Sequence, residues 1–298
     1  MKVAVGADVG GTKIDISVAA LDGTPLAQVR RPAGDWEASP VDAAARRLVA
    51  ELSAAVPAGH VIAAFGIGAQ GCDTQEHCAR LAAAVETLGG VPAVVVNDAA
   101  LLVPAAGLDR GIGLIAGTGS IGVAADAEGR VLFAGGWGWV LGDEGSAPAI
   151  VREATRAALS AHDAGLGDDG LLSALLAHFG AADPPALARC VNDRPEPGAW
   201  GPGAPAVFHA ADAGSALAAR VVDEAAGGLQ TLVAQLTARG AVGDTVVAAG
   251  SVVVHQPRLA DGLRTRLAAS HPSLTLRLLD VQPVAGGVVL ARRRLGAG

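Results

Sequence analysis

The sequence contains no tyrosine, and aromatic residues make up only 3% of its 298 positions. Cysteine occurs three times, at Cys72, Cys78 and Cys190, without the spacing of a zinc site. An odd number of scattered cysteines does not suggest a disulfide framework. We therefore expect reduced thiols in a cytoplasmic protein.

Lysine occurs only at Lys2 and Lys13, and the formal net charge is −7. A mildly acidic chain without a basic patch argues against nucleic acid as a partner. No uninterrupted apolar run reaches the roughly 18 residues that a membrane span needs. The N-terminal segment also lacks the basic and then apolar pattern of a signal peptide, so we expect no membrane partner.

Apolar residues, by contrast, make up 51% of the chain and charged residues 17%, as in folded globular proteins. The length is sufficient for two ordinary domains or one large one.

The first stretch predicts a β-hairpin, with one strand from Val3 to Asp8 and another from Ile14 to Ala20. Its tip consists of Gly10, Gly11, Thr12 and Lys13, which lets backbone N–H groups approach an anion closely. An ordinary Gly-Gly turn with an acid beside it is an equally good interpretation of this stretch alone.

A second hairpin of the same kind follows, with strands over 113–116 and 121–125 and a tip at Gly117, Thr118, Gly119 and Ser120. Each hairpin precedes a third strand, over 26–31 and 131–134 respectively. A duplicated unit of this kind predicts an α/β fold with two related domains that face each other. We expect helices over 43–56 and 75–88 and buried strands over 61–68 and 93–96 between the hairpins.

The remainder predicts mostly helices in the second half of the chain. Ser146 is expected to cap a helix that runs to about His162, and another helix is expected over 171–179. The segment 206–239 is expected to be helical with a break near Gly227 and Gly228. We expect the last elements in the order strand 245–249, helix 257–270, strand 274–278 and helix 285–295.

Two common nucleotide-binding motifs do not fit. In a P-loop, lysine precedes Ser or Thr and opens a helix, whereas here Thr12 precedes Lys13 and a strand follows. Gly117, Gly119 and Gly122 have the spacing of a dinucleotide fingerprint, but a strand again follows instead of a helix. Two hairpin tips in facing domains predict a different phosphate clamp, with Asp8 near a Mg²⁺ that bridges the phosphates. Gly250-Ser251 and Gly286-Gly287 are expected to be strand-to-helix turns against which a base lies, or else plain helix starts.

Asp98 follows the buried strand 93–96, at the sheet edge where ligands bind in open α/β sheets. A carboxylate there can accept a proton from a hydroxyl that attacks a γ-phosphate. The alternative is that Asp98 caps the next helix.

The segment 136–145 combines Trp137 and Trp139 with glycines and two acids, Asp143 and Glu144. Tryptophan faces pack against sugar rings, and carboxylates bind sugar hydroxyls or an ammonium group. The alternative is an aromatic plug beneath a glycine-rich turn.

Together these segments resemble the sugar-kinase/actin/Hsp70 superfamily, and more narrowly the BadF/BadG/BcrA/BcrD ATPase family with its N-acetylglucosamine kinases and glucosamine kinases. The matching segments are, in order, Asp8 to Thr12, Asn97 to Ala99, Gly117 to Ser120, Gly135 to Ser146 and Ala249 to Ser251. The resemblance implies two RNase H-like (actin-like ATPase) domains facing across a cleft, ATP with Mg²⁺ as cofactor, and a homodimer. We expect one domain over residues 1–109 plus 284–298 and the other over 110–283.

The resemblance also implies roles for individual residues. Asp98 corresponds to the catalytic base and Asp8 to the metal-side acid. The phosphate and adenosine positions are Gly10, Gly11, Thr12, Lys13, Gly117, Thr118, Gly119, Ser120, Gly250 and Ser251. The sugar positions are Asp73, Asn97, Asp98, Gly136, Trp137, Gly138, Asp143 and Glu144.

The expected reaction is phosphorylation of the 6-hydroxyl of an amino sugar. Asp73, Glu76, Asp143 and Glu144 suggest an acidic pocket, which favours the ammonium group of glucosamine over the acetamido group of N-acetylglucosamine. N-acetylglucosamine remains the alternative. A conformational ATPase that activates a partner enzyme and a sugar-binding regulator without catalysis are alternatives of other classes. ROK sugar kinases differ in a Glu-x-Gly-His segment and a cysteine-rich zinc site, which this sequence lacks.

Overall fold

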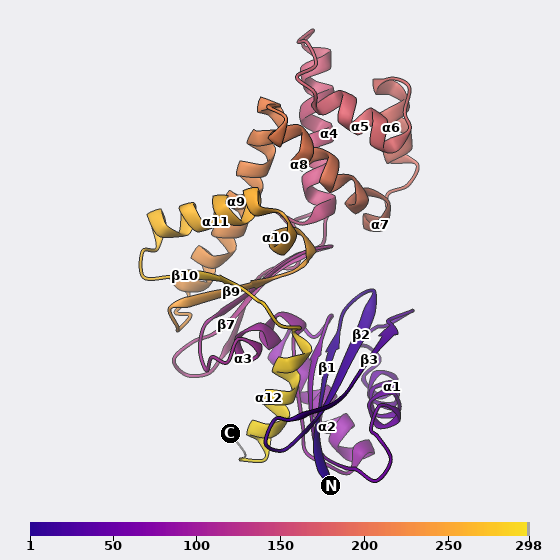
Figure 1. Cartoon of the computed structure of the whole chain (residues 1–298), viewed down its shortest axis with the longest axis vertical. Coiled ribbons are helices and arrows are strands. Elements are labelled where there is room, and N and C mark those ends of the chain that lie inside the picture. The colour runs from indigo at the N-terminus through magenta and orange to yellow at the C-terminus, as the bar shows by residue number, and fades with distance from the viewer. Residues whose placement is uncertain (297–298) are drawn as a thin grey trace.

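The computed structural model describes residues 1–296 and contains two five-stranded sheets, one in the lower part and one near the middle of Figure 1. The first sheet has the order β3-β2-β1-β4-β5. Its strands are β1 (Lys2–Val9), β2 (Lys13–Ala20), β3 (Pro25–Pro32), β4 (Val61–Ala69) and β5 (Ala93–Val96). The first three strands are antiparallel to their neighbours, while β4 and β5 run parallel to β1.

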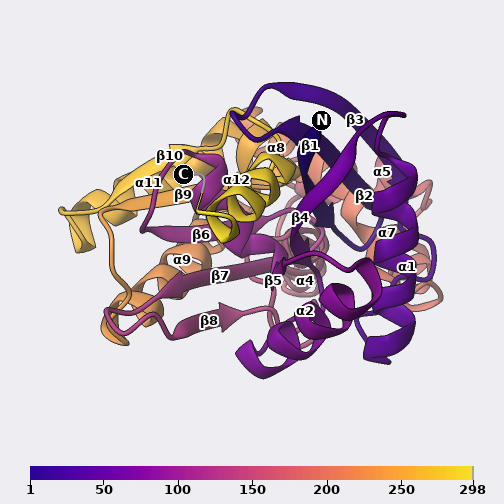
Figure 2. The same ribbon diagram turned by 90° about the horizontal axis from the view of Figure 1, so that it is seen from below.

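Both faces of this sheet are covered, which explains why β1 and β2 are apolar at nearly every position. Helices α1 (Val41–Ala54) and α2 (Gln75–Gly89) share one core with Val3, Val5 and Phe65. Helix α12 (Val284–Arg294) packs on the opposite face, along β1 and β4 (Figure 2).

The second sheet repeats the topology of the first in the order β10-β9-β6-β7-β8. Its strands are β6 (Ile112–Ala116), β7 (Ser120–Ala125), β8 (Val131–Gly135), β9 (Thr245–Ala249) and β10 (Thr275–Leu278). Again three strands form an antiparallel meander, and the last two run parallel to the first. The predicted α/β fold with two related domains is therefore confirmed.

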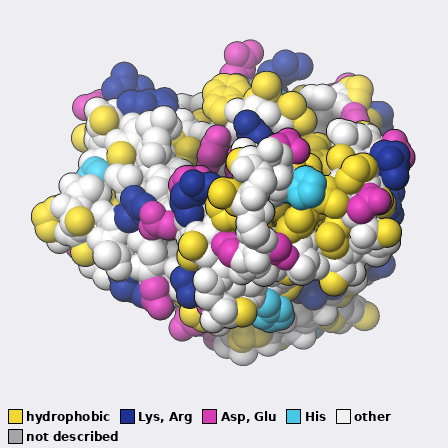
Figure 3. Space-filling model, turned by 90° about the horizontal axis from the view of Figure 1, so that it is seen from above, with side chains coloured by type: hydrophobic (Ala, Val, Ile, Leu, Met, Phe, Trp, Pro, Cys, Tyr) yellow, Lys and Arg dark blue, Asp and Glu magenta, His cyan; other side chains and the backbone are white. Residues whose placement is uncertain are grey.

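Most helices belong to the second unit and build a helical end above its sheet (Figure 1). They are α4 (Ala147–Asp163), α5 (Leu171–Phe179), α6 (Pro184–Asn192), α7 (Pro197–Trp200), α8 (Ala204–Asp212), α9 (Ala216–Ala238), α10 (Ser251–His255) and α11 (Pro257–Ser270). Short turns of 3₁₀ helix occur at η1 (Asp98–Leu101) and η2 (Gly201–Gly203), and α3 (Leu102–Ala105) follows η1. Seen from above, the surface carries basic and acidic side chains intermixed (Figure 3). None of the helices within residues 1–296 is both long and apolar enough to cross a membrane.

The predicted break at Gly227 and Gly228 is wrong, because α9 runs through both residues without interruption. The break lies instead before α9, where the Ser215 side chain accepts a hydrogen bond from the Ala218 N–H and caps the helix. Gly228 allows a close contact: a Cβ there would lie 2.5 Å from the Cβ of Glu144.

Gly286 and Gly287 are not a strand-to-helix turn but lie within α12. A Cβ on Gly287 would lie 2.9 Å from the Ala7 backbone nitrogen, so glycine lets α12 rest on the backbone of β1. The prediction that a base lies against this pair is therefore wrong.

We propose the division that the sequence suggested, with residues 1–109 and 284–298 in one domain and 110–283 in the other. The packing of α12 on the first sheet supports it. Residues 297 and 298 lie outside the described part of the chain.

Candidate active site

Asp8 and Asp98 lie at one edge of the first sheet, because β1, β4 and β5 are parallel neighbours. Asp8 pairs in register with Gly68, and Gly68 pairs with Val96. Asp98 is the first residue of η1, two residues after β5 ends at Val96, and a Cβ on Gly68 would lie 3.1 Å from the Asp98 Cα. Glycine at position 68 therefore lets the Asp98 backbone lie over the end of β4.

The surroundings of both carboxyl groups raise their pKa values, which favours the binding of a proton or a cation. Burial, and then the charge of Asp98, raise the pKa of Asp8 to about 7. Burial raises the pKa of Asp98 to about 6, partly offset by a hydrogen bond from the Ala99 N–H. Perturbed carboxyl groups at a sheet edge are typical of functional sites.

Asn97 is the N-cap of η1, since its Oδ1 accepts the Ala99 N–H at 3.0 Å. Asp98 Oδ1 accepts the same N–H at 3.0 Å. Asp98 therefore assists the cap, but the cap does not depend on Asp98 alone. Within residues 1–296 no hydrogen bond is made to Asp98 Oδ2.

Asp73 is connected to this edge through Asn97, whose Nδ2 donates to Asp73 Oδ1 at 2.9 Å. Asp73 does not cap the next helix, because Thr74 Oγ1 accepts the N–H of His77 and is the cap of α2. The exposed Asp73 carboxylate thus stands beside Asn97, with one oxygen engaged.

The first hairpin tip is exposed at Gly11 and Thr12, as a phosphate-binding turn must be. The Lys13 Nζ, however, lies 2.9 Å from Asp15 Oδ2, and this buried carboxylate also accepts from Arg30 at 2.6 Å. These two cations lower the pKa of Asp15, against the effect of burial. Lys13 is therefore already paired within the hairpin.

Gln70 is a residue that the sequence analysis missed. A Cβ on Gly11 would lie 2.7 Å from Gln70 Oε1, so this side chain lies against the first tip. The backbone carbonyl of Gln70 accepts a hydrogen bond from Trp36 Nε1 at 3.1 Å. Its position immediately after a buried strand was the signal that could have identified it.

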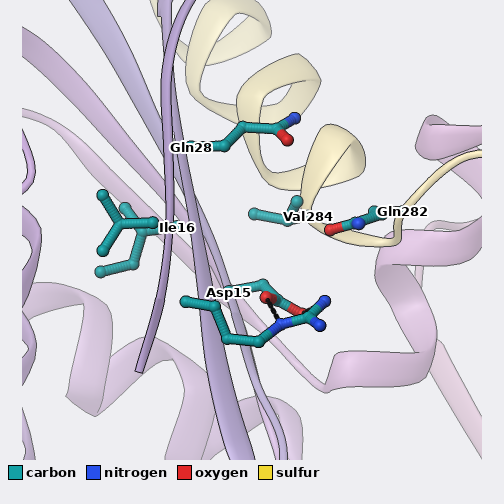
Figure 4. Close-up of a pocket in the computed structure, with 7 residues that line it drawn as sticks. Asp15, Ile16, Gln28, Gln282 and Val284 are labelled. Atoms are coloured by element: carbon teal, nitrogen blue, oxygen red, sulfur yellow. Dashed lines mark hydrogen bonds and ion pairs between the residues drawn. The ribbon is translucent and has the colours of Figure 1, made fainter. Parts of the chain in front are cut away.

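A cavity of about 190 Å³ lies on the α12 side of the first hairpin (Figure 4). The lining residues come from β2, β3 and the segment before α12, and they are Asp15, Ile16, Gln28, Val29, Arg30, Gln282 and Val284. None of the predicted site residues lines this cavity, so it is separate from the predicted site.

The second tip lies between two other predicted loops. A Cβ on Gly117 would lie 3.5 Å from the Ser251 N, and one on Gly119 would lie 3.1 Å from Asp143 Oδ2. The buried Ser120 donates its hydroxyl to the Glu144 carbonyl at 2.9 Å. The structure thus brings together the tip, the Gly250-Ser251 turn and the segment 136–145, while Thr118 remains exposed.

Segment 136–145 has an unusual backbone. Gly136, Gly138 and Gly145 have positive φ, and Asp143 also adopts φ 58° although it is not glycine. Asp143 is buried, and burial raises its pKa despite hydrogen bonds from backbone N–H groups of Ser120 and Gly138. Strain of this kind at a non-glycine residue is found at ligand sites more often than elsewhere.

The two tryptophans of this segment have different environments. Trp139 packs on the buried Trp200 with ring centroids 5.1 Å apart, so it is the aromatic plug. Trp137 is 76% exposed and free to receive a ligand. Arg152 on α4, which the sequence analysis also missed, donates a hydrogen bond to the Trp139 carbonyl and fixes this part of the segment.

Helix η1 contacts β6 and β7, so Asp98 lies where the two units meet. No cluster of three or more metal-ligating side chains exists among residues 1–296. A divalent cation would therefore depend on Asp8 together with phosphate oxygens and water, which is how Mg²⁺ commonly binds. The buried Asp8 carboxyl, whose raised pKa persists despite the charge of Lys13, fits such an ion.

A family model matches residues 5–291, and its description is the BadF/BadG/BcrA/BcrD ATPase family. The chain belongs to this family. As a member of the BadF/BadG/BcrA/BcrD ATPases it is related to nucleotide-using enzymes, in agreement with the resemblance of its motifs.

A curated relative of this family member is the N-acetylmuramic acid/N-acetylglucosamine kinase of Clostridium acetobutylicum, with 32% identity over 169 residues. The match spans 55% of each chain, so only about half of that relative is compared.

Two solved structures cover nearly the whole fold. One is a protein of Chromobacterium violaceum with a proposed N-acetylglucosamine kinase activity, at TM-score 0.72 and 26% identity, with 97% and 99% of the two chains covered. The other is a ROK family glucokinase of Streptomyces griseus in complex with glucose and AMPPNP, at TM-score 0.63 and 21% identity, with 98% and 99% covered. The latter supports the two-domain fold alone.

Proposed function

We propose that this protein transfers the γ-phosphate of ATP to the 6-hydroxyl of an amino sugar. The observation that carries the proposal is Asp98, a carboxyl with a raised pKa beside Asp8 at the meeting of the two units. The kinases among its relatives support a sugar as phosphate acceptor.

In this proposal Asp98 accepts the proton of the sugar hydroxyl as that oxygen attacks the γ-phosphate. Its free Oδ2 provides the accepting atom, while Oδ1 is fixed by the Ala99 N–H. Mg²⁺, when bound near Asp8, would neutralise charge on the phosphates. The tips at Gly10–Thr12 and Gly117–Ser120 hold the phosphates through backbone N–H groups, and Gly250-Ser251 lies against the nucleoside.

We assign the sugar to the space among Asp73, Asn97, Trp137 and Asp143. Asn97 positions the Asp73 carboxylate, and the exposed face of Trp137 stacks on the ring. The acidic side chains favour glucosamine, whose ammonium pairs with a carboxylate, while N-acetylglucosamine is the second candidate. The names of the relatives support the second candidate, since both mention an N-acetylated sugar.

A conformational ATPase that activates a partner enzyme is the alternative of another class. Such activators of this family hold an iron–sulfur cluster between subunits. Cys72 lies before α2, Cys78 within α2, and Cys190 on α6 in the other unit, so they do not form one site. A homodimer remains a prediction from the resemblance alone.

The test is a coupled assay of ADP release with ATP and Mg²⁺ over glucosamine, N-acetylglucosamine, glucose, mannosamine and N-acetylmannosamine. We expect the amino sugars to stimulate ADP release. Asp98→Asn should lower kcat by about 10²- to 10⁴-fold while ATP binding persists. No stimulation by any sugar would refute the kinase, and near-full activity of the variant would refute the base.

A further inference from the structure

Two cysteines lie close together beneath the loop that carries Asp73. Cys72 is fully buried, and Cys78, on the first turns of α2, is 8% exposed. The Cys78 thiol donates to the Cys72 carbonyl at 3.4 Å. Both are free cysteines, and Cys190 lies apart from them on α6.

The environment makes Cys78 the more reactive of the two. The hydrogen bond from the Cys72 thiol, with smaller contributions from the backbone N–H groups of Cys78 and Asn97, lowers the pKa of Cys78. Burial and the Asp73 carboxylate act in the opposite direction. The same thiol–thiol contact, together with burial, raises the pKa of Cys72.

This pair is connected directly to the proposed sugar site. Asn97 contacts Cys78 through its N–H and Asp73 through its side chain, and the next residue is Asp98. Asp73 itself follows Cys72 in the chain. A bond between the two sulfurs would therefore affect both groups that position the Asp73 carboxylate, which are the preceding residue Cys72 and the hydrogen-bond donor Asn97.

We propose that Cys72 and Cys78 form a peroxide-sensitive dithiol whose oxidation to a disulfide weakens sugar binding. The buried Cys78 thiol lies beneath the loop that carries Asp73 and donates to the Cys72 carbonyl at 3.4 Å, and this geometry is the basis of the inference. Its effect on the sugar rests on the proposed function.

The chemistry balances with a hydroperoxide as oxidant. The Cys78 thiolate attacks one peroxide oxygen, the O–O bond breaks, and Cys78 becomes a sulfenic acid while the other oxygen leaves as water. Cys72 sulfur then attacks the Cys78 sulfur, the S–O bond breaks, and the second oxygen leaves as water. In total the two thiols lose two protons and two electrons, and hydrogen peroxide becomes two waters. A dithiol reductant reverses the reaction.

The disulfide removes the hydrogen bond that the Cys78 thiol donates to the Cys72 carbonyl, and it changes the contact between the Asn97 N–H and the Cys78 sulfur. The loop before α2 must then shift, and Asp73 with it. We expect a several-fold increase in KM for the sugar with a smaller change in KM for ATP.

The experiment treats the folded full chain with hydrogen peroxide and then blocks the remaining thiols with iodoacetamide. Peptide mapping should show a Cys72–Cys78 link and an unlinked Cys190, and a Cys190→Ser variant should form the same link. Cys78→Ala should not form it. Dithiothreitol should restore the KM for the sugar.

Separate alkylation of Cys72 and Cys78 after peroxide, or overoxidation of Cys78 with Cys72 still free, would overturn the dithiol. A complete link with unchanged sugar kinetics would overturn its effect on the site. If the untreated protein shows no sugar-stimulated ADP release, the proposed function fails, while the peptide map still decides whether the dithiol exists.

Discussion

Replacing Gly228 by alanine tests whether α9 supports the segment that holds Asp143 and Glu144. In a helix interior this change alone would add about 1 kcal/mol of stability. Here, however, the new Cβ would lie 2.5 Å from the Glu144 Cβ, closer than such atoms approach. Overpacking of this kind costs about 1–3 kcal/mol, so the net effect ranges from about zero to a loss of about 2 kcal/mol.

The matched control is Gly227→Ala in the same helix. Its Cβ would meet Arg266 side-chain atoms at 3.6 Å, an ordinary contact, so the gain of about 1 kcal/mol should be kept. The two variants should therefore differ by about 1–3 kcal/mol although they are adjacent.

Urea unfolding followed by tryptophan fluorescence measures this difference, because Trp137, Trp139 and Trp200 lie in the same unit as α9. Gly228→Ala should also raise KM for the sugar, since Glu144 must move, whereas Gly227→Ala should leave KM unchanged. Equal stabilisation of both variants with unchanged kinetics would refute the role assigned to Gly228.

Three further predictions concern charge at the site. Because Asp98 accepts a proton only when ionised, and its pKa is raised to about 6, kcat/KM for the sugar should fall as pH decreases through about 6; a flat profile from about pH 5 to 8 would contradict this. Asp73→Asn should raise KM for glucosamine by about 2- to 5-fold, as expected for an exposed ion pair, and change KM for N-acetylglucosamine less; equal effects would refute the ammonium contact. N-acetylmuramic acid should have a kcat/KM at least about tenfold lower than that of N-acetylglucosamine. The carboxylate of N-acetylmuramic acid would find no free cation, because Lys13 is paired with Asp15 and Arg152 with Glu153. Comparable values would show that one of these cations is released.

Much of the fold could be predicted from the sequence because its signals are local. The hairpins, the buried strands and the cap at Ser146 depend on a few neighbouring residues, and the structure has each of them. The repeat of one topology also followed from a repeated order of strands and turns.

The wrong predictions concern positions where glycine is needed for a tertiary contact and not for a turn. A pair of glycines usually marks a turn, but Gly228 and Gly287 lie inside helices because Glu144 and Ala7 approach them from distant parts of the chain. No local pattern distinguishes these cases.

The candidate site shows the same limit. Asp8 and Asp98 could be placed at a sheet edge from strand order, but their raised pKa values depend on burial and on charges from other parts of the chain, Asp98 acting on Asp8 and Asp73 on Asp98. Gln70 and Arg152 reach the site through side-chain contacts that no motif records. The assigned roles of all these residues remain predictions that the variants above can test.

The position of α12 has a consequence for how the protein is made. The face of β1 and β4 that α12 covers leaves the ribosome early, whereas α12 follows roughly 215 residues after β4. At about 5–20 residues per second, that face stays uncovered for about 10–40 s during synthesis. The core of the first unit therefore cannot be completed until the other unit has been translated. A chain released before α12 is made would keep an apolar sheet face exposed to chaperones or to aggregation.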